Sequence, residues 1–242
     1  MVTTNIRLIT FDLDDTLWDP RPALEAGEIA QRLYLRSRFP SLELNKVPSK
    51  LLSNIRQSLL VEQPELAHKI SLFRESFIKR LLQSQGIPDN ESKVAANEAF
   101  AAFLSHRHEV AIFANAEEAL TSLSRRYKIG ALTNGNADVR KTGIGKYFNF
   151  AWRAEEYGVS KPDPAFFQTA FAQVGVEPHE VIHVGDCHQN DVFGAAEAGA
   201  KAIWFKPEGG TSDIASRVVN QLSDLPDAIE QIASLEKYNQ LR

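Results

Sequence analysis

The chain has 242 residues, of which 43% are hydrophobic and 24% charged, and its formal net charge is −4. These values are ordinary for a soluble globular protein of one large or two small domains, and they give no reason to expect binding to nucleic acid or membranes. The single cysteine, Cys187, excludes an internal disulfide and fits a reducing compartment. Because the N-terminus shows no signal-peptide pattern, we expect a cytoplasmic protein.

The first predicted element is a strand over residues 6–11, whose apolar run suits a buried, parallel position. It is followed at once by Asp12, Asp14 and Asp15. Unpaired buried carboxylates are costly, so the strand must deliver Asp12 and Asp14 to its carboxyl end, where open α/β sheets bind ligands. Alternation would place both on one side, where Mg²⁺ could lie between them. The same acids could instead belong to the N-terminus of a helix.

A helical insertion follows this strand. Between residues 21 and 103 the sequence predicts four amphipathic helices and no strand, with turns at 39–41, 62–64 and 86–90. The apolar faces are expected to contain Leu24, Ile29, Leu33 and Tyr34; Leu51, Leu52, Ile55 and Leu59; Leu72, Phe73, Phe77, Leu81 and Leu82; and Val94, Ala99, Phe100, Phe103 and Leu104. Four such helices make a small bundle.

From about residue 113, predicted strands and helices alternate, which is typical of βαβ units and a parallel sheet. The predicted strands are 128–132, 148–152, 181–184 and 202–205, and the predicted helices are 116–126, 138–147, 160–174, 191–198 and 225–241. The core is therefore discontinuous. We expect residues 1–18 and 110–242 to form an α/β, Rossmann-like domain, with residues 19–109 inserted as a lid over the acidic strand end.

Polar residues also follow the later strands. Thr133 and Asn134 could bind an anion at a helix N-terminus or simply cap that helix. Lys161 lies in a proline-rich turn, where most lysines are solvated. Asp186 and Asp191 follow a short apolar strand, and a pair of carboxylates in that position favours a metal site over two helix caps. Taken together, these residues predict a single site at one edge of the sheet.

In order and spacing the motifs closely resemble those of the haloacid dehalogenase (HAD) superfamily. They read Asp12-Leu13-Asp14-Asp15-Thr16, Thr133-Asn134, Lys161-Pro162 and Gly185-Asp186-x4-Asp191. The resemblance covers essentially the whole chain, and the inserted bundle resembles the C1 cap of this family. It implies a Mg²⁺-dependent phosphatase that hydrolyses a small phosphate ester through an aspartyl-phosphate. The second half of the chain looks most like bacterial phosphatases of flavin mononucleotide and of the phosphorylated ribitylaminouracil precursor of riboflavin.

The resemblance also implies a role for each motif residue. Asp12 would be the nucleophile, and Asp14 would protonate the leaving alcohol and then activate water. Thr133, Asn134 and Lys161 would bind the phosphoryl oxygens and neutralise their charge. Lys161 would also pair with Asp12 and keep it ionised.

The implied metal ion has its own set of residues. Mg²⁺ would be held by the Asp12 carboxylate, the Asp14 main-chain carbonyl and Asp186, with Asp191 steadying the site from further out. In the cap, Arg74 is a candidate for binding the substrate, although an exposed structural arginine is an equal alternative. Similarly, a tryptophan at the junction of the domains, Trp18, could stack on a substrate ring or be a packing residue. The oligomeric state is left open.

Several alternatives remain. Dehalogenases of this superfamily use one nucleophilic Asp and no metal, and the second acid, Asp14, argues against that activity. A phosphonate hydrolase would need a cap lysine that forms a Schiff base, and the sequence does not single one out. A phosphomutase shares all four motifs. A two-component receiver is disfavoured by the length and the insertion, and a non-catalytic phosphate-binding protein by the intact motifs.

Overall fold

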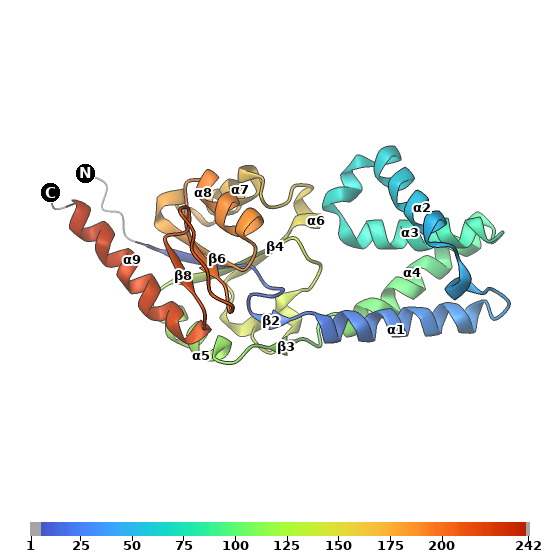
Figure 1. Cartoon of the computed structure of the whole chain (residues 1–242), viewed down its shortest axis with the longest axis horizontal. Helices are drawn as coiled ribbons and strands as arrows, with labels where there is room; N and C mark the ends of the chain where they lie inside the picture. The colour runs from blue at the N-terminus through green and yellow to red at the C-terminus, as the bar shows by residue number, and fades with distance from the viewer. Residues whose placement is uncertain (1–5, 241–242) are drawn as a thin grey trace. The chain divides into compact units, whose positions relative to one another are not determined.

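The computed structural model describes residues 6–240, and the side chains of residues 6–235. The chain forms two compact units (Figure 1). One is Pro20–Val110, which we call the helical unit, and the core unit comprises the chain before and after it. None of the described helices has the length and apolar character that crossing a membrane would require.

A six-stranded sheet with the order β5-β4-β1-β6-β7-β8 lies at the centre of the core unit (Figure 1). The strands are β1 (Leu8–Phe11), β4 (Lys128–Thr133), β5 (Phe150–Arg153), β6 (Val181–Gly185), β7 (Lys201–Phe205) and β8 (Arg217–Val219). Neighbouring strands of this sheet pair in parallel. β1 lies between β4 and β6 and is buried along its length, as its apolar run predicts. The predicted α/β, Rossmann-like fold is confirmed.

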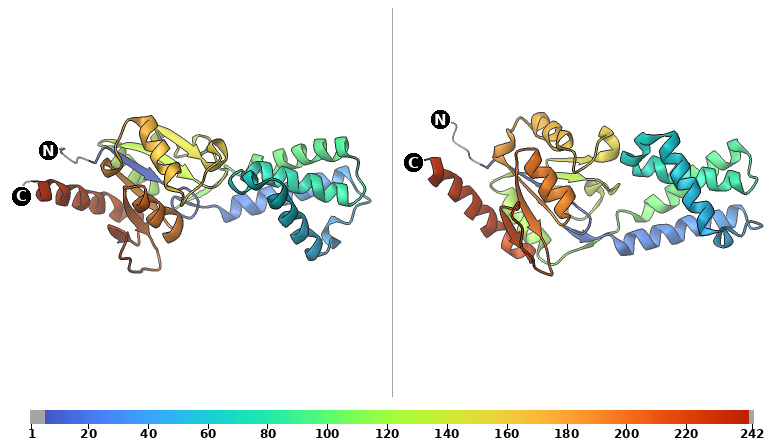
Figure 2. Two further views of the ribbon diagram at one scale, coloured as in Figure 1. Left: turned by 90° about the horizontal axis from the view of Figure 1, so that it is seen from above. Right: turned by 45° about the horizontal axis from the view of Figure 1, so that its top comes forward.

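Helices cover both faces of this sheet. They include α5 (Ala116–Ser124), α7 (Pro164–Val174), α8 (Gly194–Glu197) and α9 (Leu225–Gln240). α7 and α8 lie on one face, and α5 and α9 lie on the other (Figure 2). Three phenylalanines of α7, Phe166, Phe167 and Phe171, are buried in one cluster with apolar residues of β1, β5 and β6. α7 begins after Asp163, whose carboxylate accepts the Ala165 N–H, and this side-chain cap fixes its start.

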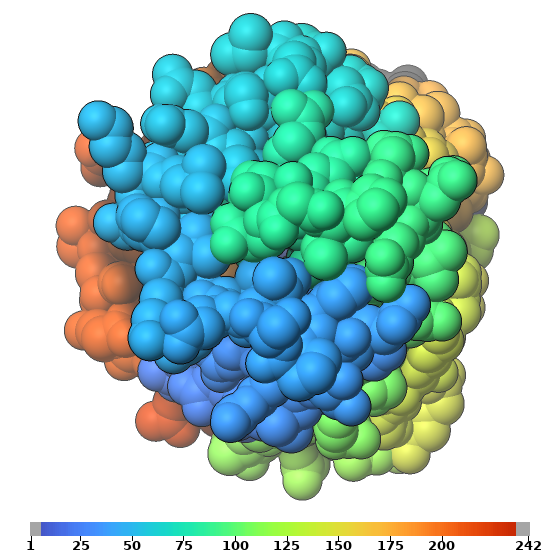
Figure 3. Space-filling view, turned by 90° about the vertical axis from the view of Figure 1, so that its right-hand side faces the viewer, coloured from blue at the N-terminus to red at the C-terminus, as the bar shows by residue number. Residues whose placement is uncertain are grey.

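The helical unit contains the four predicted helices. They are α1 (Arg21–Arg38), α2 (Ser49–Glu62), α3 (Ile70–Ser84) and α4 (Asp89–His106). α4 lies between α1 and α3, and α2 packs against α3 (Figure 3). Gly86, at a φ of 88°, and Pro88 separate α3 from α4, because neither residue favours a continuing helix.

The buried faces of these helices were predicted only in part. Four residues expected on apolar faces are exposed: Ile29, Leu33, Leu72 and Val94. α1 instead approaches α4 through small residues such as Gly27, where a Cβ would lie 2.7 Å from the Phe103 ring. A helical periodicity argument gives most weight to large apolar side chains, whereas a close helix contact is made by small ones.

The prediction of a helix over 138–147 is wrong. Two 3-10 turns, Val139–Lys141 and Gly145–Tyr147, occupy this segment. The Asp138 side chain accepts the Arg140 N–H in a local turn, and Gly143 contributes low helix propensity. The local hydrogen bond and the glycine therefore favour a turn over a continuous helix.

The segment predicted as a helix over 191–198 begins earlier and in another form. A π-helical turn over His188–Phe193 precedes the short helix α8. A further short helix, α6 (Ala154–Tyr157), and the edge strand β8 were not predicted. The final predicted helix is confirmed as α9 as far as Gln240, and residue 241 lies outside the described residues.

A second, two-stranded sheet lies where the chain leaves and re-enters the core unit. β2 (Trp18–Asp19) pairs antiparallel with β3 (Ala111–Ile112), and Trp18 lies opposite Ile112. Both connections to the helical unit begin at this pair of strands, which we call the ribbon. Two-residue strands leave no periodicity to detect, so the sequence did not predict them.

Candidate active site

The motif residues meet because their strands are neighbours. Asp12 directly follows β1, Thr133 ends β4, and Asp186 directly follows β6. Since β1 pairs in parallel with both β4 and β6, these three carboxyl ends lie at the same edge of the sheet. The structure therefore brings these predicted site residues to one place.

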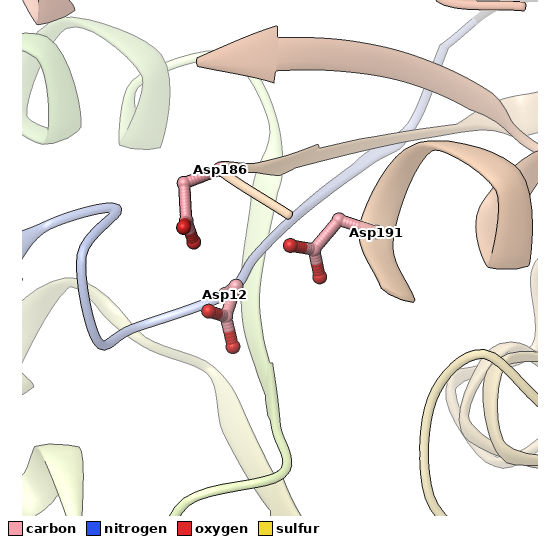
Figure 4. Close-up of side chains that lie close together, drawn as sticks. All are labelled: Asp12, Asp186 and Asp191. Carbon is pink, nitrogen blue, oxygen red and sulfur yellow. The ribbon is translucent and has the colours of Figure 1, made fainter. Parts of the chain in front are cut away.

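Three carboxylates point toward one another at this edge (Figure 4). Asp12, Asp186 and Asp191 each offer one oxygen, and these oxygens all lie within 4.8 Å of one another. Asp12 is 9% exposed and Asp191 is 1% exposed. Burial, although opposed by Lys161, raises the pKa of Asp12 to about 8, and burial together with the charge of Asp191 raises the pKa of Asp186 to about 6. The cluster therefore favours a cation.

Lys161 supplies one cation to this cluster. Its Nζ donates to Asp12 Oδ1 at 2.7 Å and to Asp191 Oδ1 at 2.6 Å. Burial opposes its charge, but the two carboxylates outweigh burial and raise the pKa of Lys161 to about 12. Burial likewise opposes the ionised form of Asp191, but Lys161 and the hydrogen bond from His183 lower the pKa of Asp191 to about 2. Lys161 is therefore a buried ammonium shared by two carboxylates.

Asn134 holds the backbone that carries this lysine. Its Nδ2 donates to the Lys161 carbonyl and its Oδ1 accepts the Lys161 N–H, each at 2.9 Å. Thr133 is 2% exposed, and its Oγ1 accepts the Gly135 N–H at 3.0 Å. The amide of Asn134 is thus bound to the loop that carries Lys161. Thr133 lies at the end of β4, next to β1, the strand that precedes Asp12.

Two exchanged hydrogen bonds connect the first motif to Asp186. Thr16 Oγ1 donates to Asp186 Oδ1 at 3.1 Å and accepts the Asp186 N–H at 3.0 Å. Trp204 Nε1 donates to the Asp186 carbonyl at 2.7 Å. At Gly185 a Cβ would lie 2.2 Å from Asp191 Cγ, so a glycine is required there for Asp191 to enter the cluster.

Asp14 lies outside the group of three carboxylates. Its Oδ1 accepts the indole N–H of Trp18 at 2.8 Å. Trp18 is fully buried, so it contributes packing and this hydrogen bond and has no exposed ring face for a ligand. The turn between them includes Asp15 at a φ of 59°.

A family model for haloacid dehalogenase-like hydrolases matches residues 6–199. The chain belongs to this family. It is 32% identical over 205 residues, 85% of each chain, to the 5-amino-6-(5-phospho-D-ribitylamino)uracil phosphatase YigB of Escherichia coli strain K12. It is 34% identical over 138 residues, 54% of each chain, to a phosphoserine phosphatase of Thermus thermophilus.

A solved structure covers nearly the whole chain. It is a 2-haloacid dehalogenase from Pseudomonas syringae pv. Tomato DC3000, 40% identical, with a TM-score of 0.88, and the match covers 94% of this chain and 99% of that one. The predicted membership of the HAD family is confirmed. The matched phosphatases support the predicted phosphatase activity on a small phosphorylated metabolite.

HAD phosphatases generally use a divalent metal ion, and the residues here fit one. The cluster has three carboxylates, and the ammonium group of Lys161 pairs with two of them, Asp12 and Asp191, which leaves an excess of negative charge in a largely buried place. Carboxylate oxygens are the hard ligands that such ions prefer. Asp191 is the least available of the three, because Lys161 donates to its Oδ1 and the Cys187 N–H donates to its Oδ2 at 2.9 Å.

His183 is a residue of this HAD site that sequence reasoning missed. It is fully buried in β6, with Nδ1 2.9 Å from Thr10 Oγ1 and Nε2 3.1 Å from Asp191 Oδ1. Burial lowers the pKa of His183, which favours the neutral ring. Since Asp191 is an acceptor, Nε2 carries the proton and the Thr10 hydroxyl donates to Nδ1. The sequence did contain one signal that could have identified His183, namely a histidine within an otherwise apolar predicted strand.

Arg74 has its partners within the helical unit. Its guanidinium lies 3.8 Å from the centroid of the Phe103 ring and 3.9 Å from a carboxylate oxygen of Glu28. Burial lowers the pKa of Arg74, and Glu28 opposes that change. These contacts give Arg74 a place in the packing of α1, α3 and α4.

Proposed function

We propose that the protein is a Mg²⁺-dependent phosphomonoesterase that acts on a small phosphorylated metabolite through an aspartyl-phosphate. The observation that supports this most is the Asp12 carboxylate, which belongs to a cluster of three carboxylates and accepts the Lys161 ammonium. A carboxylate nucleophile needs to be ionised. The Lys161 ammonium favours ionisation but does not outweigh burial, which raises the pKa of Asp12 to about 8, so a bound cation would supply the remaining positive charge.

The proposed reaction has two displacements. A carboxylate oxygen of Asp12 forms a bond to phosphorus while the bond from phosphorus to the ester oxygen breaks, and Asp14 gives its proton to that oxygen. Asp14 then removes a proton from water, which attacks phosphorus, releases phosphate and restores the carboxylate of Asp12. Thr133 and Lys161 would stabilise the charge on the transferring oxygens.

Mg²⁺ is the divalent ion that we propose for this cluster. The Asp12 and Asp186 carboxylates and the main-chain carbonyl of Asp14 would hold it, and Asp191 would support the site through Lys161. When bound, the ion supplies positive charge that allows an anionic nucleophile to approach an anionic phosphate.

For the substrate we propose flavin mononucleotide or a ribityl phosphate of the riboflavin pathway. The support is the similarity to YigB, whose name specifies a phosphoribitylaminouracil. We further propose that residues 1–18 and 110–242 are the catalytic core and that residues 19–109 are a cap that selects the substrate. Arg74 is then a candidate contact in the cap, and the free Cys187 suits a cytoplasmic location.

Phosphate release with a panel of substrates tests the proposal. Purified protein is assayed on flavin mononucleotide, sugar phosphates and nucleotides, with Mg²⁺ and with EDTA. Turnover that requires Mg²⁺ and is fastest on flavin mononucleotide or a ribityl phosphate supports both the chemistry and the substrate. Equal, low turnover across the panel supports the proposed phosphatase activity and rejects the proposed flavin-type substrate. No release of phosphate from any ester overturns the proposal.

Dehalogenation is the second candidate, because a structure 40% identical to this chain is a 2-haloacid dehalogenase. Displacement of halide by Asp12 would need neither a proton donor for the leaving group nor a divalent cation. The acid Asp14 and the three clustered carboxylates favour phosphoryl transfer. Halide release from 2-chloropropionate in EDTA, without phosphate release in Mg²⁺, would reverse this preference.

The Asp12→Asn variant is expected to lose turnover by about 10³-fold or more while it stays folded, because an amide is a very weak nucleophile. Steady-state phosphate release and circular dichroism measure the two properties. Asp138→Asn is the matched control, since this carboxylate caps the 3-10 turn Val139–Lys141 and is not one of the three clustered carboxylates. Turnover by Asp12→Asn at the wild-type rate would contradict the mechanism.

A further inference from the structure

The indole of Trp18 is bound to the proposed general acid. Trp18 Nε1 donates to Asp14 Oδ1 at 2.8 Å, and the tryptophan is fully buried. The chain returns on itself between the two residues, because Asp15 adopts a φ of 59° and donates its N–H to the Trp18 carbonyl at 2.9 Å. An isolated β-bridge between Asp14 and Trp18 closes this turn.

The backbone of Trp18 is held in place by the second strand of the ribbon. It is the first residue of β2 and pairs with Ile112 of β3 in the ribbon. The N–H of Phe113 donates to the Leu17 carbonyl at 3.0 Å, which extends this contact by one residue. Because the backbone of Trp18 is paired and its side chain is fully buried, the indole has little room to rotate, and its N–H is held beside the carboxyl group.

We propose that Trp18 is a positioning residue for Asp14. A carboxyl group rotates readily about its terminal torsion, which has a broad energy profile. The indole N–H, a donor that cannot accept a proton, fixes one oxygen and so sets the plane in which the group exchanges its proton with the ester oxygen. This inference rests on the proposed role of Asp14 as general acid.

The inference predicts a dependence on the leaving group. Protonation by a general acid matters most when the leaving oxygen is strongly basic, and little when it is stable as an anion. Loss of positioning should therefore slow the cleavage of phenyl phosphate far more than that of p-nitrophenyl phosphate. A general loosening of the fold would slow both esters alike.

The test measures kcat/KM for p-nitrophenyl, phenyl and p-methoxyphenyl phosphate with wild type and Trp18→Phe. kcat/KM reports the first displacement and is independent of the later hydrolysis of the aspartyl-phosphate. We expect a loss of about tenfold or more on phenyl phosphate and of less than about threefold on p-nitrophenyl phosphate. An equal loss on the three esters, or no loss, overturns the proposal.

Two controls separate this inference from the proposed function. Asp14→Asn should show the same dependence on the leaving group, with larger losses; if it shows none, the role of Asp14 fails and the inference fails with it. Trp152→Phe changes a buried tryptophan that stacks on Tyr157, and it should reduce the three values equally or not at all.

A second variant covers the case in which Trp18→Phe fails to fold. Replacing Trp18 with 3-benzothienylalanine keeps the bicyclic shape and removes the N–H, because sulfur takes the place of nitrogen. This variant should stay folded and show the leaving-group dependence. If this variant is folded and its kcat/KM values depend on the leaving group as those of wild type do, the proposal is contradicted.

Discussion

At the scale of single residues, the two oxygens of Asp191 are both occupied by protein donors. Oδ1 accepts from Lys161 and His183, and Oδ2 accepts the Cys187 N–H. A carboxylate bound in this way is suited to hold other groups in place. Asp191 fixes the ammonium of Lys161, and the same ammonium is bound to Asp12. The geometry of the proposed nucleophile thus depends on residues that need not touch the substrate.

His183 gives a test of this dependence. His183→Leu leaves the Thr10 hydroxyl without its partner and removes one of the two donors to Asp191 Oδ1, so we expect the free energy of unfolding to fall by about 1–3 kcal/mol and activity to need more Mg²⁺. His183→Gln keeps an N–H donor, so it should lose less stability and need a smaller increase in Mg²⁺. Urea denaturation and the Mg²⁺ concentration for half-maximal activity are measured. Equal effects of the two variants would contradict a role for the N–H donor.

At the scale of elements, the sequence predicted the strands well where a continuous apolar run ended in polar residues. β1, β4 and β6 carry that signal, and their parallel pairing alone was enough to bring Asp12, Thr133 and Asp186 together. The ribbon gave no comparable signal, because it joins two-residue strands from distant parts of the chain. The contact from Thr10 through His183 to Asp191 likewise depends on the packing of β1, β6 and the turn His188–Phe193 against one another, which no single segment of sequence contains.

The helices of the insertion show the same limit of sequence-based prediction, namely that contacts between distant segments are not visible in one segment. Periodicity predicted that four helices exist, but it did not identify the buried face of α1, since that face is formed by Ala23, Gly27 and Leu35. Leu33 belongs to the predicted apolar stripe, yet it is 61% exposed, whereas Leu35 is 4% exposed. The contact with α4, which selects the small residues, lies far away in the sequence.

Two leucines on α1 therefore provide a matched pair. Leu35→Ala should lower the free energy of unfolding by about 2–4 kcal/mol, because it leaves a cavity between α1 and its neighbours. Leu33→Ala should change it by less than about 0.5 kcal/mol, since the side chain is in solvent. Urea denaturation followed by circular dichroism compares the two. The opposite order would show that the predicted apolar stripe, and not the small-residue face, is buried.

At the scale of the whole molecule, the clustered carboxylates connect the site to stability. The pKa of Asp12 is about 8, compared with 3.8 as the ordinary value, so the folded protein retains a proton that the unfolded chain releases between these pH values. Folding is therefore disfavoured as pH rises from about 4 to about 8. Asp186, with a pKa of about 6, acts in the same direction from about 4 to 6. Asp191 acts in the opposite direction, because its pKa is lowered from 3.8 to about 2. It stabilises the fold at pH values above about 4 and loses that contribution as the pH falls from about 4 to about 2.

Between pH 5 and pH 8 the metal-free protein is therefore expected to lose stability, by at most about 1.4 kcal/mol per pH unit for each retained proton. Asp12→Asn removes the main titrating group and should flatten this dependence. Urea denaturation in EDTA at pH 5, 6, 7 and 8 compares the two proteins, and the difference between them cancels the contributions of groups that they share. Mg²⁺ should stabilise wild type more at pH 8 than at pH 5, because it binds the ionised carboxylates, and should stabilise Asp12→Asn less. Parallel pH profiles for wild type and Asp12→Asn would mean that Asp12 is ionised throughout this range, with the Lys161 ammonium fully offsetting the cost of its burial.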